Sequence, residues 1–218
     1  MTENYKEIFR ILSSGDDNFP WNHFSIAKEF IKENTVFLNL SGDFAEKLLD
    51  KKYPPQKISV INGIDTPWFD ALVTSGMQVY DNLSDCKDES FTLITNRFSR
   101  DDLSLIKSKL KKGGHYISEE IGFETYKSFF DALNIKAEFD SEINLENVAQ
   151  NLKSNGFKLV FRNQKYVKRT LKKDEAIIFL NALKGYFPIL SNVSYDIIKD
   201  GVTFIDHRFI YTAKKLTN

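Results

Sequence analysis

The sequence is short of the residues that crosslink or interrupt a chain: it has one cysteine, five prolines and ten glycines among 218 residues. A lone cysteine, Cys86, excludes an internal disulfide and any metal site built from several cysteines. Few breakers beside nineteen phenylalanines indicate a compact, aromatic-rich fold with few long loops.

An excess of charge of either sign is also absent, since thirty basic residues balance thirty acidic ones. This argues against a general electrostatic attraction to nucleic acid or anionic lipid, although a local patch could survive the averaging. No apolar stretch approaches the roughly 18 residues of a membrane span. The three histidines lack metal-ligand spacing. We therefore expect a cytoplasmic protein with no membrane segment and no metal site.

The first half of the chain alternates short apolar runs with helical stretches. Two helices, at 4–12 and 23–34, come first, and a helix is also expected over 101–112 before a Gly-Gly turn. The apolar runs lie at 35–40, 57–62, 77–81, 90–97 and 115–122. Strands of this length alternating with helices are typical of βαβ units and a parallel sheet.

The second half changes character, because two longer strand patterns, 157–168 and 203–214, follow and enclose helical segments. The helical patterns lie at 126–135, 143–157, 174–187 and 193–201. We predict that 203–214 runs antiparallel beside 157–168. We also predict that inserts at 123–155 and 174–200 cover the carboxyl edge of the sheet, with GYFPIL (185–190) as a pocket wall.

Three stretches carry a resemblance to a known family. LKKGGHYISEEIG (110–122), DESFTLITNR (88–97) and DHRFIYTAKK (206–215) resemble, in order and spacing, segments of class I S-adenosylmethionine-dependent methyltransferases. The resemblance covers nearly the whole chain and is closest to bacterial small-molecule or RNA-type methyltransferase-like proteins with degenerate cofactor motifs.

This resemblance implies an α/β, three-layer Rossmann-like methyltransferase fold with a mostly parallel seven-stranded sheet whose last strand is antiparallel. It also implies a single domain over 1–218. Within it, 1–34 would form N-terminal helices, 35–122 the cofactor-side half, and 123–218 the substrate-side half with its helical inserts.

The departures from the family fall on the cofactor positions. The family's first strand ends in an acid before a glycine-rich turn that lets the backbone approach the cofactor, whereas this chain has Asn39 and then Leu40-Ser41-Gly42-Asp43-Phe44. The family's second strand ends in an acid that holds the ribose, and this chain has Asn62, whose amide has one accepting oxygen.

Each of these residues also has a local interpretation. Ser41 and Gly42 could face the methionine part of the cofactor with Asp43 near its charge, while Asp43 could equally cap the next helix, the alternative that we favour. Asn62 could bind ribose or make an Asn-Gly turn. Asp81 could read the adenine amino group or be an exposed turn residue.

Asn96, Arg97 and Glu119 end the fourth and fifth strands, where open α/β sheets bind ligands, and are the catalytic candidates. Arg97 could pair with an anionic substrate or the cofactor carboxylate, or be a surface arginine. Glu119 could act as a base if burial raised its pKa. Adjacent Glu120 should point to the opposite face. Trp21 could close over a ligand or belong to a packed N-terminal segment.

The sequence therefore predicts a methyltransferase that binds S-adenosylmethionine weakly and acts on an unknown small-molecule or RNA acceptor. The cofactor ligands would be Asn39, Ser41, Gly42, Asp43, Asn62, Asp81 and Asn96. The sulfonium already activates the methyl group, so the protein mainly aligns the reactants. The alternative is a non-catalytic binding or regulatory protein of the same fold that has lost cofactor binding.

Overall fold

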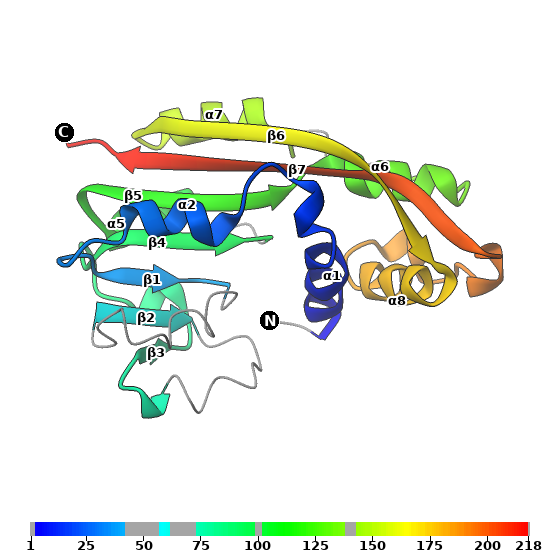
Figure 1. The fold of residues 1–218 in the computed structure, drawn as a ribbon, viewed down its shortest axis with the longest axis horizontal. Coiled ribbons are helices and arrows are strands. Elements are labelled where there is room, and N and C mark those ends of the chain that lie inside the picture. The colour runs from blue at the N-terminus through cyan, green and yellow to red at the C-terminus, as the bar shows by residue number, and fades with distance from the viewer. Residues whose placement is uncertain (1–2, 42–56, 62–72, 99–101, 138–142, 218) are drawn as a thin grey trace. The chain divides into compact units, whose positions relative to one another are not determined.

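The protein forms a seven-stranded sheet with the strand order β3-β2-β1-β4-β5-β7-β6 (Figure 1). The structure, a computed structural model, describes residues 3–41, 57–61, 73–98, 102–137 and 143–217. Strands β1 to β5 pair in parallel, and β7 is antiparallel. The predicted fold, with 203–214 beside 157–168, is confirmed.

The strands are β1 (Phe37–Asn39), β2 (Ile58–Ile61), β3 (Gln78–Tyr80), β4 (Phe91–Arg97), β5 (Leu110–Ile121), β6 (Phe157–Lys172) and β7 (Gly201–Lys215). The described helices are α1 (Glu3–Ser13), α2 (His23–Phe30), α5 (Leu103–Lys109), α6 (Phe123–Ala132), α7 (Leu145–Ser154) and α8 (Lys173–Lys184). Short 3-10 turns lie at η1 (Asp16–Asn18), η3 (Leu83–Asp85), η4 (Pro188–Leu190) and η5 (Tyr195–Ile197).

The chain divides into two compact units, to which β6 and β7 both contribute. Unit 1 comprises Met1–Pro20, Ile121–Leu145 and Gln164–Phe209, and unit 2 comprises Trp21–Glu120, Glu146–Asn163 and Ile210–Asn218. That the chain acts as a single domain, with inserts over the carboxyl edge of the sheet, stays a prediction.

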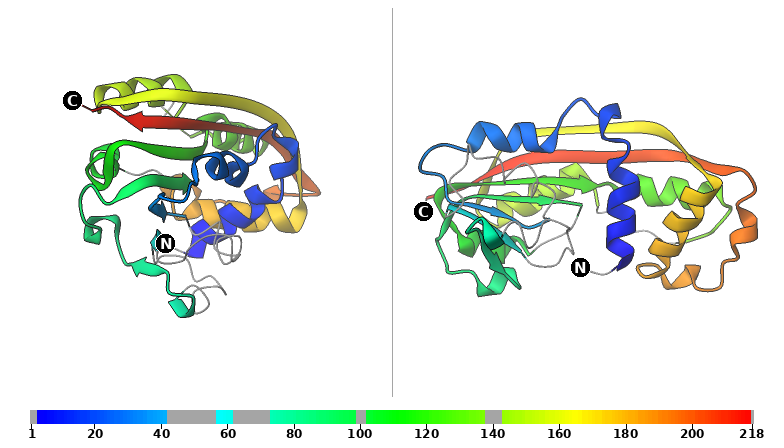
Figure 2. Two further views of the ribbon diagram at one scale, coloured as in Figure 1. Left: turned by 60° about the vertical axis from the view of Figure 1, so that its left-hand side comes forward. Right: turned by 60° about the horizontal axis from the view of Figure 1, so that its bottom comes forward.

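The core of unit 2 forms where α2 packs on one face of the parallel strands (Figure 2). Asn22 begins this helix, since its side chain accepts a hydrogen bond from Ser25 N at 3.0 Å. Ala27 then packs against Phe37 and Leu93. Burial of these apolar surfaces is the main stabilising contribution.

Helix α2 ends at Phe30, four residues earlier than predicted. The Thr35 hydroxyl donates to Phe30 O at 3.1 Å and accepts from Lys32 N at 2.8 Å. These two bonds satisfy backbone groups at the end of the helix and turn the chain into β1, so the helical pattern of 31–34 is overridden locally.

The predicted helix over 101–112 and its Gly-Gly turn are also wrong in part. Helix α5 ends at Lys109, and β5 begins at once with Leu110. Gly113 has φ +76°, and a Cβ on Gly114 would lie 2.9 Å from Lys111 O. The two glycines therefore form an irregularity inside the strand, where the register with β4 shifts. The segment 193–201, predicted to be helical, contains only η5.

In unit 1, two arginines hold the end of α1 against β6 and β7. Arg208 is fully buried and donates to both carboxylate oxygens of Asp206, at 3.0 and 2.7 Å, and to Leu12 O at 2.5 Å. Arg169 donates to Asp206 at 3.2 Å and to the carbonyl oxygens of Ile11 and Leu12. The last carbonyls of a helix lack partners within it, so these guanidinium groups anchor α1.

We expect Arg208→Met to lower the free energy of unfolding by about 3–5 kcal/mol, because it leaves the buried Asp206 without its best partner. Arg162→Met is the control, since Arg162 forms an exposed pair with Glu146 and should cost less than about 1 kcal/mol. Urea unfolding followed by circular dichroism measures both. Equal, small losses would contradict the anchoring role of Arg208.

His207, next to this cluster, is buried as an uncharged ring. Tyr166 stacks on it with ring centroids 4.1 Å apart, and a Cβ on Gly122 would overlap the imidazole. Neither ring nitrogen has a hydrogen-bond partner among the described residues. Burial lowers the pKa of His207 from 6.5 to about 4, against a smaller raising effect of Asp206.

Stability should therefore fall as the pH drops from about 6.5 to 4. In this window the unfolded chain binds a proton at His207 that the folded chain does not, and below pH 4 both states bind it. His207→Phe preserves an aromatic ring and should flatten this part of the profile. Urea unfolding of both proteins from pH 7 to 3.5 tests this, and parallel profiles would refute it.

Candidate functional site

The carboxyl ends of β1 and β4 meet at the centre of the sheet in unit 2. The strand order reverses between them, since β1 has β2 on one side and β4 on the other. Ligands of open α/β sheets bind at such a switch point. Five residues proposed from the sequence lie within two residues of the carboxyl ends of β1, β4 and β5: Asn39, Ser41, Asn96, Arg97 and Glu119.

Asn39 ends β1 and is bonded to the neighbouring strand. Its side-chain nitrogen donates to the Thr95 hydroxyl at 3.0 Å, and Leu40 N donates to Thr95 O at 2.9 Å. Asn39, Ser41 and Thr95 are all fully buried. Sequence reasoning missed Thr95, and the only indication was a polar residue within the apolar strand pattern FTLITNR.

Arg97 and Glu119 form a buried ion pair across β4 and β5. Arg97 Nε donates to Glu119 Oε2 at 2.7 Å, and Trp21 Nε1 donates to Glu119 Oε1 at 3.1 Å. Both carboxylate oxygens thus accept N–H donors, which fixes the arginine and the tryptophan. That Glu119 acts as a general base stays a prediction.

Phe98, directly after β4, supports this pair from a left-handed backbone conformation. Its φ is 58°, uncommon for a bulky residue. Phe98 N donates to Glu119 O at 2.8 Å, and the Arg97 guanidinium carbon lies 4.4 Å from the centre of the Phe98 ring. The hydrogen bond and the cation–π contact favour this conformation, which the sequence does not predict.

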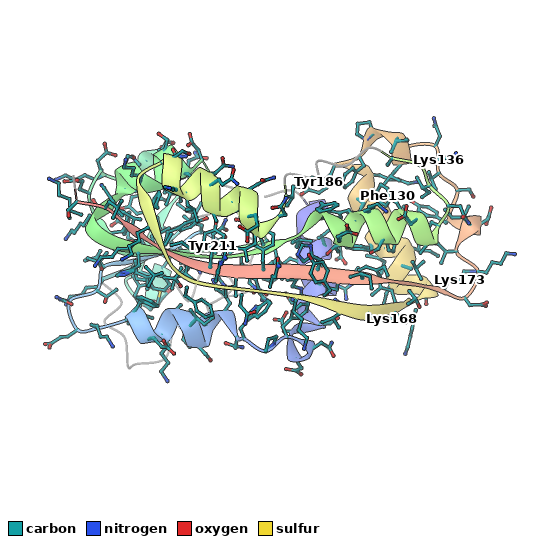
Figure 3. All side chains as sticks on the ribbon, turned by 90° about the horizontal axis from the view of Figure 1, so that it is seen from above. Phe130, Lys136, Lys168, Lys173, Tyr186 and Tyr211 are labelled. Carbon is teal, nitrogen blue, oxygen red and sulfur yellow. The ribbon has the colours of Figure 1, made fainter. Side chains whose placement is uncertain are left out.

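Alternate residues of β4 and β5 face the other side of the sheet. Asn96 Oδ1 accepts from Arg97 N at 2.8 Å, and Glu120 accepts from the Tyr211 hydroxyl at 2.6 Å (Figure 3 labels Tyr211 on β7). Burial raises the pKa of Tyr211 well above 10, with Glu120 acting in the same direction, so the phenol remains a donor. Glu119 and Glu120 therefore face opposite sides, as expected.

Of the remaining predicted ligands, Asp81 alone belongs to the described residues. Asp81 directly follows the edge strand β3 and is exposed. Gly42, Asp43 and Asn62 lie outside the described residues. In the part of the chain that is described, we find no cluster of three potential metal ligands. No helix among the described residues has the length and apolar character needed to cross a membrane.

A pocket of about 620 Å³ lies in unit 1 and is lined by Lys136, Ala137, Phe187, Pro188 and Ile189. Phe130 packs on Phe187 with ring centroids 5.2 Å apart. Figure 3 labels Phe130, Lys136 and Tyr186 in this region. The segment 185–190 thus lines a pocket, and its role toward a substrate stays a prediction.

No protein-family model and no curated protein sequence matches the chain. Solved structures do match it. The YcgJ protein of Bacillus subtilis has a TM-score of 0.58 at 10% identity over 90% of this chain and 98% of its own. A SAM-dependent methyltransferase from Methanosarcina mazei has a TM-score of 0.54 at 13% identity over 92% and 99%.

A further match is phosphoethanolamine N-methyltransferase 2 of Haemonchus contortus in complex with S-adenosylhomocysteine. It has a TM-score of 0.52 at 15% identity and covers 99% of this chain and 59% of its own. At such identities the likeness defines the fold alone. The chain has the fold of class I S-adenosylmethionine-dependent methyltransferases.

We expect Glu119→Gln to destabilise unit 2 by about 3–5 kcal/mol, because it leaves Arg97 buried without its counter-charge. Trp21→Phe removes one hydrogen bond to a charged group and should cost about 1.5–3 kcal/mol. Glu29→Gln, an exposed change on α2, should stay within about 0.5 kcal/mol. Urea unfolding decides, and a Glu119→Gln protein as stable as the Glu29→Gln control would exclude the ion pair.

Proposed function

We propose that the chain binds S-adenosylmethionine at the carboxyl ends of β1 and β4 and transfers its methyl group to a small-molecule or RNA acceptor. The observation that carries this is the set of buried polar residues, Asn39, Ser41 and Asn96, at the switch point of a methyltransferase fold. In the matched Haemonchus contortus structure, a protein of this fold holds S-adenosylhomocysteine.

The donor set suits this cofactor. Amides and hydroxyls both donate and accept hydrogen bonds, as ribose hydroxyls and an amino-acid group require. Gly42, Asp43, Asn62 and Asp81 complete the proposed ligand set. When bound, the cofactor supplies a methyl group activated by the sulfonium, and this chain's part is to hold and orient it. Amides in place of acids make the binding weak.

The second candidate is a non-catalytic binding or regulatory protein. The engagement of both Glu119 oxygens by Arg97 and Trp21 favours it, since the carboxylate then serves to hold two side chains in place. A folded protein that binds neither S-adenosylmethionine nor S-adenosylhomocysteine would favour this function.

The cofactor should raise the melting temperature. At a hundredfold excess over the dissociation constant the stabilisation is about 2.7 kcal/mol, and in a chain of this size each kcal/mol gives about 2–4 °C. S-adenosylmethionine and S-adenosylhomocysteine at millimolar concentration should therefore produce a rise of several degrees in differential scanning fluorimetry. A folded sample with no rise from either ligand would overturn the proposal.

Variants should distinguish cofactor ligands from structural residues. Loss of a ligand reduces the rise in melting temperature that the cofactor causes, whereas loss of a structural residue lowers the melting temperature without cofactor. Asn39→Leu, Asn62→Ala and Asp43→Ala should shrink the rise, whereas an Asp43 that only caps its helix would lower the starting temperature and leave the rise intact. Asn151→Leu, an exposed change on α7, is the control and should leave both values unchanged.

A further inference from the structure

Strand β6 concentrates positive charge in a chain whose net charge is zero. The segment 158–173 has no acidic residue and seven basic ones: Lys158, Arg162, Lys165, Lys168, Arg169, Lys172 and Lys173. β6 is the edge strand of the sheet, and most of its side chains are exposed. Arg162 and Arg169 form ion pairs with Glu146 and Asp206, so the five lysines supply the rest of the positive charge of this segment.

Within unit 1, the exposed aromatic ring of Tyr166 lies on the same strand as Lys168 and Lys172. Tyr166 is 52% exposed, and its ring stacks on the buried His207 with an interplanar angle of 12°. The imidazole fixes the tyrosine ring on one side, and the exposure of Tyr166 leaves the ring accessible from solvent. Lys168 and Lys172 lie on the same face of β6 as Tyr166, two and six residues along the strand, or about 6.6 and 20 Å.

We propose that this face of β6, formed by Tyr166, Lys168 and Lys172, binds single-stranded nucleic acid. A base stacks on the open side of Tyr166, extending the His207–Tyr166 stack by one ring, and the lysines hold the flanking phosphates. Positively charged surfaces with interleaved aromatic rings bind single strands in this way, with little sequence preference. The inference is independent of the proposed cofactor site, and its test uses no cofactor.

Lysines on an edge strand also protect it from pairing with other chains. Protection of the edge does not require an exposed tyrosine stacked on a buried ring. β6 also exposes Val160 (52%) and Phe161 (41%), and exposed apolar side chains on an edge strand favour pairing with other chains. Stacking on Tyr166 is therefore what separates the two roles. Figure 3 labels Lys168 on β6 and Lys173 at the start of α8.

The test is fluorescence anisotropy of a 5′-labelled twelve-nucleotide oligouridylate titrated with the full-length protein at 50–200 mM salt. Binding should weaken with salt by about 0.7 logarithmic units in affinity per phosphate contact for each tenfold increase. Lys168→Gln/Lys172→Gln should lower that slope by about 1.4. Lys111→Gln/Lys112→Gln, exposed in unit 2 and matched in net charge, should leave it unchanged.

Changes at Tyr166 test the stack itself. Tyr166→Ser should weaken binding about tenfold, and Tyr166→Phe should bind like the unchanged protein because it keeps the ring. Circular dichroism confirms that each variant is folded.

Three results would overturn the proposal: no anisotropy rise at 50 mM salt, equal losses for both lysine pairs, or binding indifferent to Tyr166→Ser. Sedimentation with phosphatidylserine vesicles in the absence of oligonucleotide binding would assign the segment to a membrane surface and likewise refute it. The cofactor-induced melting shift is measured separately, so failure of either proposal leaves the other standing.

Discussion

Parallel pairing of β1 with both β2 and β4 is the constraint on which the rest of the structure depends. β1 is only three residues long, yet it has a hydrogen-bonded neighbour on each side, and Leu40 N and Val36 O extend its pairing with β4. Because the first strand of the chain lies inside the sheet, later strands add first on one side of it and then on the other, and the strand order reverses beside it. The residues that end β1 and β4 therefore meet at one point, where the buried amide of Asn39 donates to the buried hydroxyl of Thr95 without a buried charge.

Two buried ion-pair clusters, one in each unit, fix the N-terminal part of the chain. In unit 1, Arg208 and Arg169 donate hydrogen bonds to a carbonyl oxygen in the last turn of α1, that of Leu12. In unit 2, Glu119 holds Trp21, the first residue of that unit, together with Arg97. Buried pairs contribute little net stability relative to apolar packing, but the loss of one partner is costly. Their effect here is positional, because each ties an N-terminal element to strands that come about a hundred residues or more later.

Much of the fold could be predicted because it follows from local pattern. Short apolar runs separated by helical periods indicate a parallel sheet, and the late strands 157–168 and 203–214 lie side by side as expected. The errors came where tertiary contacts override the pattern: Thr35 ends α2, and Gly113 sits inside β5 rather than in a turn. For the site, the family resemblance selected Asn39, and the rule that ligands gather at strand ends selected Arg97 and Glu119. Their partners Thr95 and Trp21 are 56 and 98 residues away in the chain, and no local pattern connects such distant residues.

A net charge of zero does not exclude a locally basic surface. Thirty basic and thirty acidic residues sum to zero, and this sum argues against nucleic acid only if the charges are mixed evenly. At physiological salt, however, an exposed charge acts over a Debye length of about 8 Å, so a phosphate near β6 experiences the adjacent lysines rather than the total. Of the acids that approach this strand, Glu146 and Asp206 each pair with an arginine, and Glu175 accepts a hydrogen bond from the backbone N of Lys172. The lysines keep their charge toward solvent, and the field at the edge of the sheet is set by a stretch of sixteen residues rather than by the chain.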